Sequence, residues 1–180
     1  MLNKDINIWA KEIHSFAKAK GWWNLHRTRE EIMEMIQVEL SDATKEVKFE
    51  TPLIYQARIH KDENGIREAI PGDKEWDETI KPEGQAIELI DASIRLLDYA
   101  CWRKISMDIY PNYILEKYGS EIVFHNRLRP LLTDDTLEEG RNLTVFINCI
   151  IEWCNKKGLD FEKILEIKMQ YNKIRTFKGN

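Results

Sequence analysis

Residues 85–104 carry the apolar pattern that most limits how this chain can fold. Apolar side chains recur at helical spacing throughout the segment and cover more than half of the circumference of the expected helix. A helix this apolar is typical of a buried position in a helical domain. Its polar side chains form one strip, which consists of Glu88, Asp91, Arg95 and Asp98. We therefore expect this strip to face an internal cleft rather than open solvent.

The remaining segments predict an all-α protein. Apolar side chains at helical spacing indicate further helices over residues 5–20, 28–51, 136–157 and 160–175. A capping box begins at Thr28, and Asp160 is a predicted N-cap. Two shorter predictions complete the chain: a short helix from Pro111 to Gly119, followed by an irregular segment over residues 120–133.

One segment departs from the helical pattern. Residues 53–59 are a plausible strand, Asn64-Gly65 is a hairpin-type turn signal, and residues 66–70 are a candidate return strand. We therefore expect a small hairpin or loop inserted in a helical body.

Length and composition indicate one globular domain. The chain has 180 residues, of which 43% are hydrophobic, and its formal net charge is −4. An acidic chain without a basic block is a poor candidate for binding duplex nucleic acid. The N-terminus has no apolar signal-like run, and no apolar run is long enough to cross a membrane. The three cysteines form no C-x-x-C pair, and we interpret them as reduced, packed thiols of a cytoplasmic protein.

Two acid-x-x-acid pairs are the candidate functional residues. Glu39 and Asp42 form one pair, and Glu88 and Asp91 form the other. A spacing of three places both acids of a pair on one helix face, where like charges repel. Two explanations remain open from the pattern alone: an acidic face solvated by water, or a site for a hard cation. The four histidines are scattered and no E-x-x-H is present, so a cation held only by oxygen atoms points to magnesium or manganese.

Five separate motifs resemble those of a known family. They are Lys20–Trp23, Val38–Ala43, Glu88–Asp98, Gly158–Phe161 and Lys168–Arg175. Together they cover about half of the chain and resemble the MazG-like all-α nucleoside triphosphate pyrophosphohydrolases, particularly the short bacterial and phage members. The resemblance implies one MazG-like helical domain over residues 1–180. Segments of about 52–81 and 103–157 exceed the family's minimal core and are interpreted as insertions.

The resemblance also implies an activity and its metal ligands. Family members use magnesium to cleave between the α- and β-phosphates, which yields a nucleoside monophosphate and pyrophosphate. Carried over, Glu39, Asp42, Glu88 and Asp91 become the catalytic acids and the metal ligands, with Glu39 slightly favoured as the base. The family usually has Glu where this chain has Asp42. Members also often end with a histidine-containing tail, which the last residues here lack.

Other residues acquire roles from the same resemblance. Lys168, Asn172 and Arg175 lie at i, i+4 and i+7 and are expected to grip phosphate oxygens, although a basic helix end that complements the helix dipole has the same pattern. Trp23 becomes a candidate base contact. Asp98 is a candidate for another metal ligand or for an acid that supports the ligands, and Arg95 is a candidate for neutralising the acidic strip. We favour a supporting or structural role for both.

The resemblance leaves the partners and one alternative open. Family members are commonly homodimers or homotetramers, so we expect a homo-oligomer that binds a nucleoside triphosphate or related nucleotide. The alternative is a non-catalytic nucleotide-sensing or protein-binding module of the same fold. A purely structural bundle with a solvated acidic face is a third interpretation.

Overall fold

A computed structural model of the chain describes residues 2–57, 68–69, 71–72, 74, 76–110, 117–133 and 138–175. Within these residues the fold is all-α, as predicted, with six α-helices and two short 3₁₀ helices. The α-helices are α1 (Ile6–Ala19), α2 (Arg29–Lys48), α3 (Gln85–Arg103), α4 (Glu121–Leu128), α5 (Glu139–Lys156) and α6 (Phe161–Ile174). The 3₁₀ helices are η1 (Trp22–Asn24) and η2 (Arg129–Leu132).

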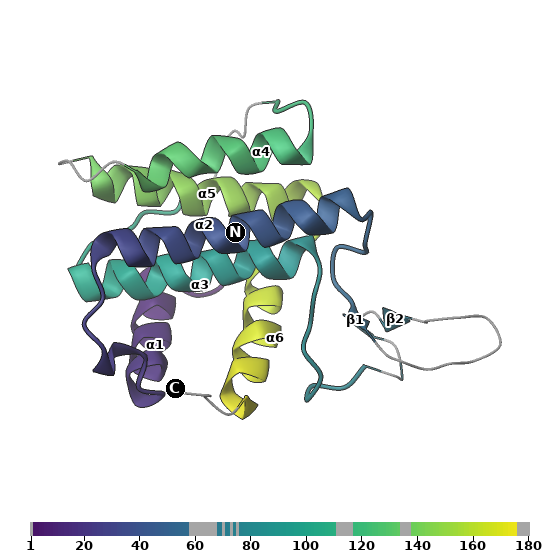
Figure 1. The fold of residues 1–180 in the computed structure, drawn as a ribbon, viewed down its shortest axis with the longest axis horizontal. Coiled ribbons are helices and arrows are strands. Elements are labelled where there is room, and N and C mark those ends of the chain that lie inside the picture. Colours follow the sequence, from purple (N-terminus) through teal and green to yellow (C-terminus); the bar gives the residue numbers. More distant parts are fainter. Residues whose placement is uncertain are drawn as a thin grey trace.

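Helices α2 and α3 form the centre of the fold. They run side by side in opposite directions, while α1 and α6 lie against α3 on one side of this pair (Figure 1). Helices α4 and α5 cover the other side and are joined through η2. Because α3 is covered on both sides, it is the most buried helix of the described chain, as its apolar pattern predicts.

The predicted helix starts are confirmed by their capping contacts. The Thr28 side chain accepts a hydrogen bond from the backbone N–H of Glu31, and the Glu31 carboxylate accepts one from the backbone N–H of Thr28. Asp160 accepts from the backbone N–H of Lys163 and starts α6. Gly84 starts α3 with a φ of 111°, and a Cβ there would lie 2.5 Å from the backbone oxygen of Leu53. Only glycine therefore allows this close approach, which fixes the position of the first turn of α3.

The described residues contain part of the predicted hairpin. Strands β1 (Gln56–Ala57) and β2 (Glu68–Ala69) pair antiparallel and extend away from the helices (Figure 1). The Gln56 side chain bonds the backbone of Asp77 and Ile80, which ties the return of this segment to its start.

The prediction of an irregular segment over residues 120–133 is wrong. Ser120 caps α4 by accepting a hydrogen bond from the backbone N–H of Val123, and the helix continues into η2. Phe124, Leu128 and Leu132 recur at a spacing of four and are each 1% exposed. Pro130 lies in the first turn of η2, where its missing N–H leaves no bond unmade. This short apolar stripe therefore stabilises a helix, which packs against α2 and η2.

Some sequence predictions fall outside the described residues. They are the Asn64-Gly65 turn, the start of the predicted helix at Pro111, residue 136 as the start of the next helix, and the tail after Arg175. No helix within the described ranges is long and apolar enough to span a membrane. Cys149 and Cys154 are buried, and burial raises the pKa of the Cys154 thiol to about 12, which agrees with unreactive packed thiols.

His125 gives the fold a sensitivity to acid. Its ring is fully buried, with Nε2 3.1 Å from the Gln85 amide nitrogen and Nδ1 2.9 Å from the Thr44 hydroxyl. Burial lowers its pKa from 6.5 to about 4. Between these pH values the folded state binds fewer protons than the unfolded state, so stability falls as pH falls, by up to about 3 kcal/mol. In His125→Gln, we expect the free energy of unfolding, measured with urea, to fall less between pH 7 and 4.5 than in the original chain. An equal fall in both would show that His125 is not responsible.

Candidate functional site

Three of the four predicted acids converge at the interface of α2 and α3. Glu39 and Asp42 on α2 and Glu88 on α3 each offer a carboxylate oxygen, and these oxygens lie within 4.8 Å of one another. Glu39 is 8% exposed and Glu88 is 6% exposed, while Asp42 is partly buried. Three carboxylates this close form a donor set suited to a hard divalent cation. The structure therefore brings three of the four predicted acids together at the interface of α2 and α3.

The fourth predicted acid, Asp91, has a different partner. Its carboxylate lies 2.5 Å from the Nζ of Lys168 on α6 and does not belong to the group of three. The Lys168 side chain is only 3% exposed. The structure thus joins the second acid pair to the helix that was predicted to grip phosphate, through a buried ion pair.

The three converging acids also have cationic partners. Arg95 Nε lies 2.6 Å from Glu39, Lys45 lies 2.5 Å from Asp42, and Lys81 lies 3.9 Å from Glu88. The Lys45 and Lys81 side chains are 67% and 45% exposed, so their ion pairs are weak and easily exchanged for another cation. The three acids are therefore neutralised by cationic side chains, and two of these, Lys45 and Lys81, are weakly held.

Burial gives the cluster an unusual affinity for protons. Desolvation by burial, and after it the neighbouring Asp91 carboxylate, raise the pKa of Glu88 to about 7. Desolvation also raises the pKa of Glu39, although the Arg95 guanidinium opposes the shift. A bound cation would favour the ionised carboxylates, so protons and a metal ion compete for the same oxygens.

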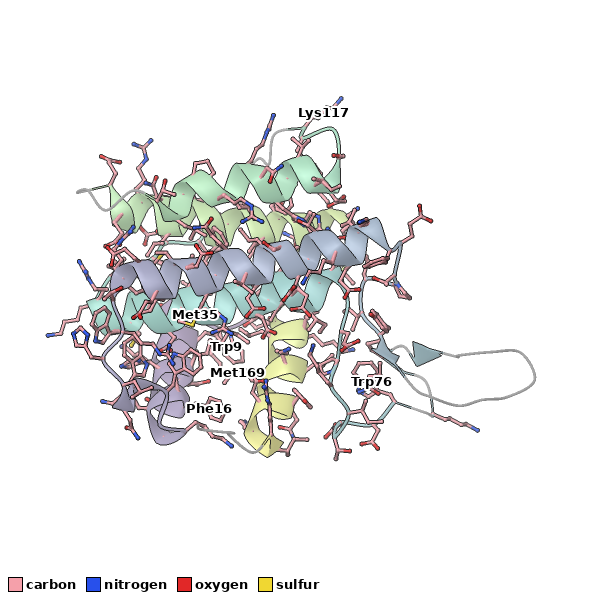
Figure 2. All side chains as sticks on the ribbon, viewed as in Figure 1. Trp9, Phe16, Met35, Trp76, Lys117 and Met169 are labelled. Carbon is pink, nitrogen blue, oxygen red and sulfur yellow. The ribbon has the colours of Figure 1, made fainter. Side chains whose placement is uncertain are left out.

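A cavity of about 500 Å³ lies between α1, η1, α2, α3 and α6. Asp91 and Arg95 line it, and Arg95 connects it to the acid group by its ion pair with Glu39. Eight of its lining residues are charged or polar: Lys20, Arg27, Asp91, Arg95, Asp98, Lys168, Asn172 and Arg175. The remainder is mainly apolar and includes Phe16 on α1 and Met35 on α2, which both lie near the space between α1 and α6 (Figure 2). The cavity is thus amphipathic.

The three predicted phosphate-binding residues lie at graded depths in this cavity. Lys168 is buried against Asp91, Asn172 is half-buried, and Arg175 is exposed at the end of α6. Their helical spacing was sufficient to predict that they share one face. The depth of Lys168 was not predictable, because it depends on Asp91 from another helix.

Asp98 and Trp23 form a separate network at the far end of the polar strip. Asp98 accepts hydrogen bonds from the Trp23 indole N–H at 3.0 Å, and its carboxylate lies 2.6 Å from His14 Nδ1. The Trp23 ring stacks on Trp102 with centroids 5.1 Å apart. Asp98 therefore holds η1 and α1 against α3, which is a structural role. The same contacts fix Trp23 in the lining of the cavity.

Several residues of this site were not identified from the sequence. His14 and Lys81 lie in segments whose local patterns carry no sign of an acidic partner. Arg27 lines the cavity from the connection before α2, where helical periodicity gives no guidance. Each of these residues is brought to the site by tertiary packing alone.

Comparisons of the chain with protein-family models, with curated proteins and with solved structures found no match. The geometry of the acids, their cationic partners and the cavity is therefore the basis for a functional proposal.

Proposed function

We propose that the protein is a magnesium-dependent nucleoside triphosphate pyrophosphohydrolase that releases a nucleoside monophosphate and pyrophosphate. The observation that carries this proposal is the amphipathic cavity lined by Lys168, Asn172 and Arg175, which Arg95 connects to the three converging carboxylates through its ion pair with Glu39. A nucleotide has the same division, with an apolar base at one end and a charged polyphosphate at the other. The resemblance of the five sequence motifs to MazG-like enzymes agrees with this interpretation.

The donor chemistry of the acids fits a magnesium ion. Glu39, Asp42 and Glu88 would hold it through oxygen atoms alone, and manganese is a reasonable substitute. When bound, the ion neutralises polyphosphate charge and polarises the P–O bonds. Asp91 stands beside this group and contributes negative charge to it.

The protein's own side chains account for binding and proton transfer. Asn172 and Arg175 would hold phosphate oxygens at the cavity, and Lys168 would keep Asp91 in place while presenting its positive charge. A water oxygen would form a bond to the α-phosphorus as the bond to the bridging oxygen breaks, so that this oxygen leaves with pyrophosphate. The water proton would pass to a carboxylate, for which Glu39 is the candidate.

The test is a nucleotide panel assayed with and without magnesium. We expect pyrophosphate and a nucleoside monophosphate as products, with no turnover after chelation of the metal. Release of orthophosphate alone would point to another reaction. Nucleotide binding without any turnover would support the non-catalytic module instead, an alternative favoured by the cation already paired with each of the four acids.

A further inference from the structure

Arg27 has a buried donor for which the protein provides no acceptor. The residue directly precedes the N-cap of α2 and lines the cavity. Its guanidinium lies 4.3 Å from the centre of the Trp22 ring, and its Nη1 lies 3.9 Å from the Met35 sulfur, a weak acceptor. Its Nε is buried without a hydrogen-bond partner. In the described part of the chain, Arg27 is also in no ion pair, unlike Arg95 and Lys168.

The contacts of Arg27 connect it to the acid group through Arg95. Its Nη1 and the Nη1 of Arg95 contact the same Met35 sulfur, at 3.9 and 3.7 Å, so the two guanidinium groups are neighbours. Arg95 in turn binds Glu39 of the acid group. The order from the acids is therefore Glu39, Arg95, Met35 and then Arg27. A ligand with its phosphates at the acids would extend its other end toward Arg27.

The surroundings of Arg27 suit a flat ring. Trp22 supports the guanidinium from one side, and Ile32, Met35 and Ile94 supply apolar walls nearby. A guanidinium fixed on an aromatic ring is oriented as a planar fork, and it can donate two parallel hydrogen bonds but accept none. The Nε itself is covered by the protein, so the atoms that a ligand in the cavity would meet are the Nη atoms of the fork.

We infer that Arg27 is a specificity-determining residue that selects nucleotides whose base presents two adjacent acceptors. This inference rests on the proposed nucleotide site. Guanine offers O6 and N7 side by side, and cytosine offers O2 and N3. Adenine places its amino donor beside each acceptor on the exposed edges, and thymine and uracil place an N–H between their two oxygens. A donor-only fork therefore satisfies guanine or cytosine and leaves an unmade bond with the others.

The test measures binding of the four deoxynucleoside monophosphates, followed by tryptophan fluorescence and by calorimetry. We expect dGMP or dCMP to bind about tenfold or more tightly than dAMP and dTMP. Arg27→Lys keeps the charge but loses the fork, so it should reduce this ratio to near one. Arg27→Gln supplies one donor and one acceptor, which match adenine, and should shift the preference toward dAMP. Arg141→Lys, on the exposed part of α5, is the matched control and should leave the ratio unchanged.

The outcomes separate this inference from the proposed function. Melting temperatures of the variants establish that each is folded before its ratio is interpreted. Pyrophosphate release from all four deoxynucleoside triphosphates with equal efficiency would overturn the role of Arg27 and leave the proposed function intact. An unchanged guanine or cytosine preference in Arg27→Gln would also overturn it. Failure of the original chain to bind any nucleotide would overturn both.

Discussion

Glu88→Gln is expected to abolish magnesium-dependent turnover and, at pH 8 without metal, to leave the fold at least as stable as before. Glu88 is 6% exposed, and its carboxylate is one of the three that converge. A neutral amide of the same shape removes the anionic oxygen from the metal site, for which we expect a loss of at least about 100-fold in kcat. It also removes the cost of keeping a charge in a poorly hydrated position.

The pH dependence of stability gives this prediction a second readout. The folded-state pKa of Glu88 is about 7, against 4.5 for an ordinary glutamate. Between these values the folded chain binds more protons than the unfolded chain, so the free energy of unfolding falls as pH rises, by up to about 3 kcal/mol. His125 acts in the opposite direction over an overlapping range. The difference between the original chain and Glu88→Gln, measured by urea unfolding at pH 5 and 8, therefore isolates Glu88.

Glu34→Gln is the matched control, because Glu34 is exposed on α2 and is not one of the three converging acids. It should change neither turnover nor the pH dependence. Millimolar magnesium should raise the melting temperature of the original chain and of Glu34→Gln, but not that of Glu88→Gln. Full turnover in Glu88→Gln would rule out the assigned metal site. A large loss of stability at pH 8 would show that Glu88 is needed as a charged partner.

The apolar pattern of α3 was sufficient to predict most of the site. When a helix is apolar over more than half of its surface, its remaining polar strip must face whatever polar space the interior offers. Asp91, Arg95 and Asp98 line the cavity, and Glu88 lies with Glu39 and Asp42, which their spacing of three places on one face of α2. Local periodicity therefore determined which faces of these two helices meet.

Periodicity did not predict which partner each acid of the polar strip on α3 would have. Asp91 and Glu88 are equivalent in spacing, yet one meets Lys168 of α6 and the other meets Lys81 from the segment before α3. Asp98, two turns further along, meets His14 and Trp23. These partners come from distant parts of the chain. Their arrival depends on how α1 and α6 lie across α3, which no local pattern contains.

Lys168→Met is expected to lower the free energy of unfolding by about 2–3 kcal/mol. Removing one member of a buried ion pair commonly costs about 3–5 kcal/mol, because the other charge remains without compensation. The lower value is expected here because the Asp91 side chain is 18% exposed and borders the cavity, so water can reach it. Lys163→Met, at an exposed position of the same helix, is the control and should change stability little. Urea unfolding at pH 7.5 measures all of these effects.

The double variant Asp91→Asn/Lys168→Met separates the two roles assigned to Lys168. If its main contribution to stability is to neutralise Asp91, the double variant should recover most of the stability lost in the single one, since no buried charge remains. Phosphate binding should not recover, because the cation that would face the polyphosphate is still missing. Recovery of stability together with unchanged affinity for a nucleoside triphosphate would show that Lys168 serves only the fold. If stability is not recovered, the Lys168 side chain stabilises the fold through its packing against neighbouring residues and not through its charge.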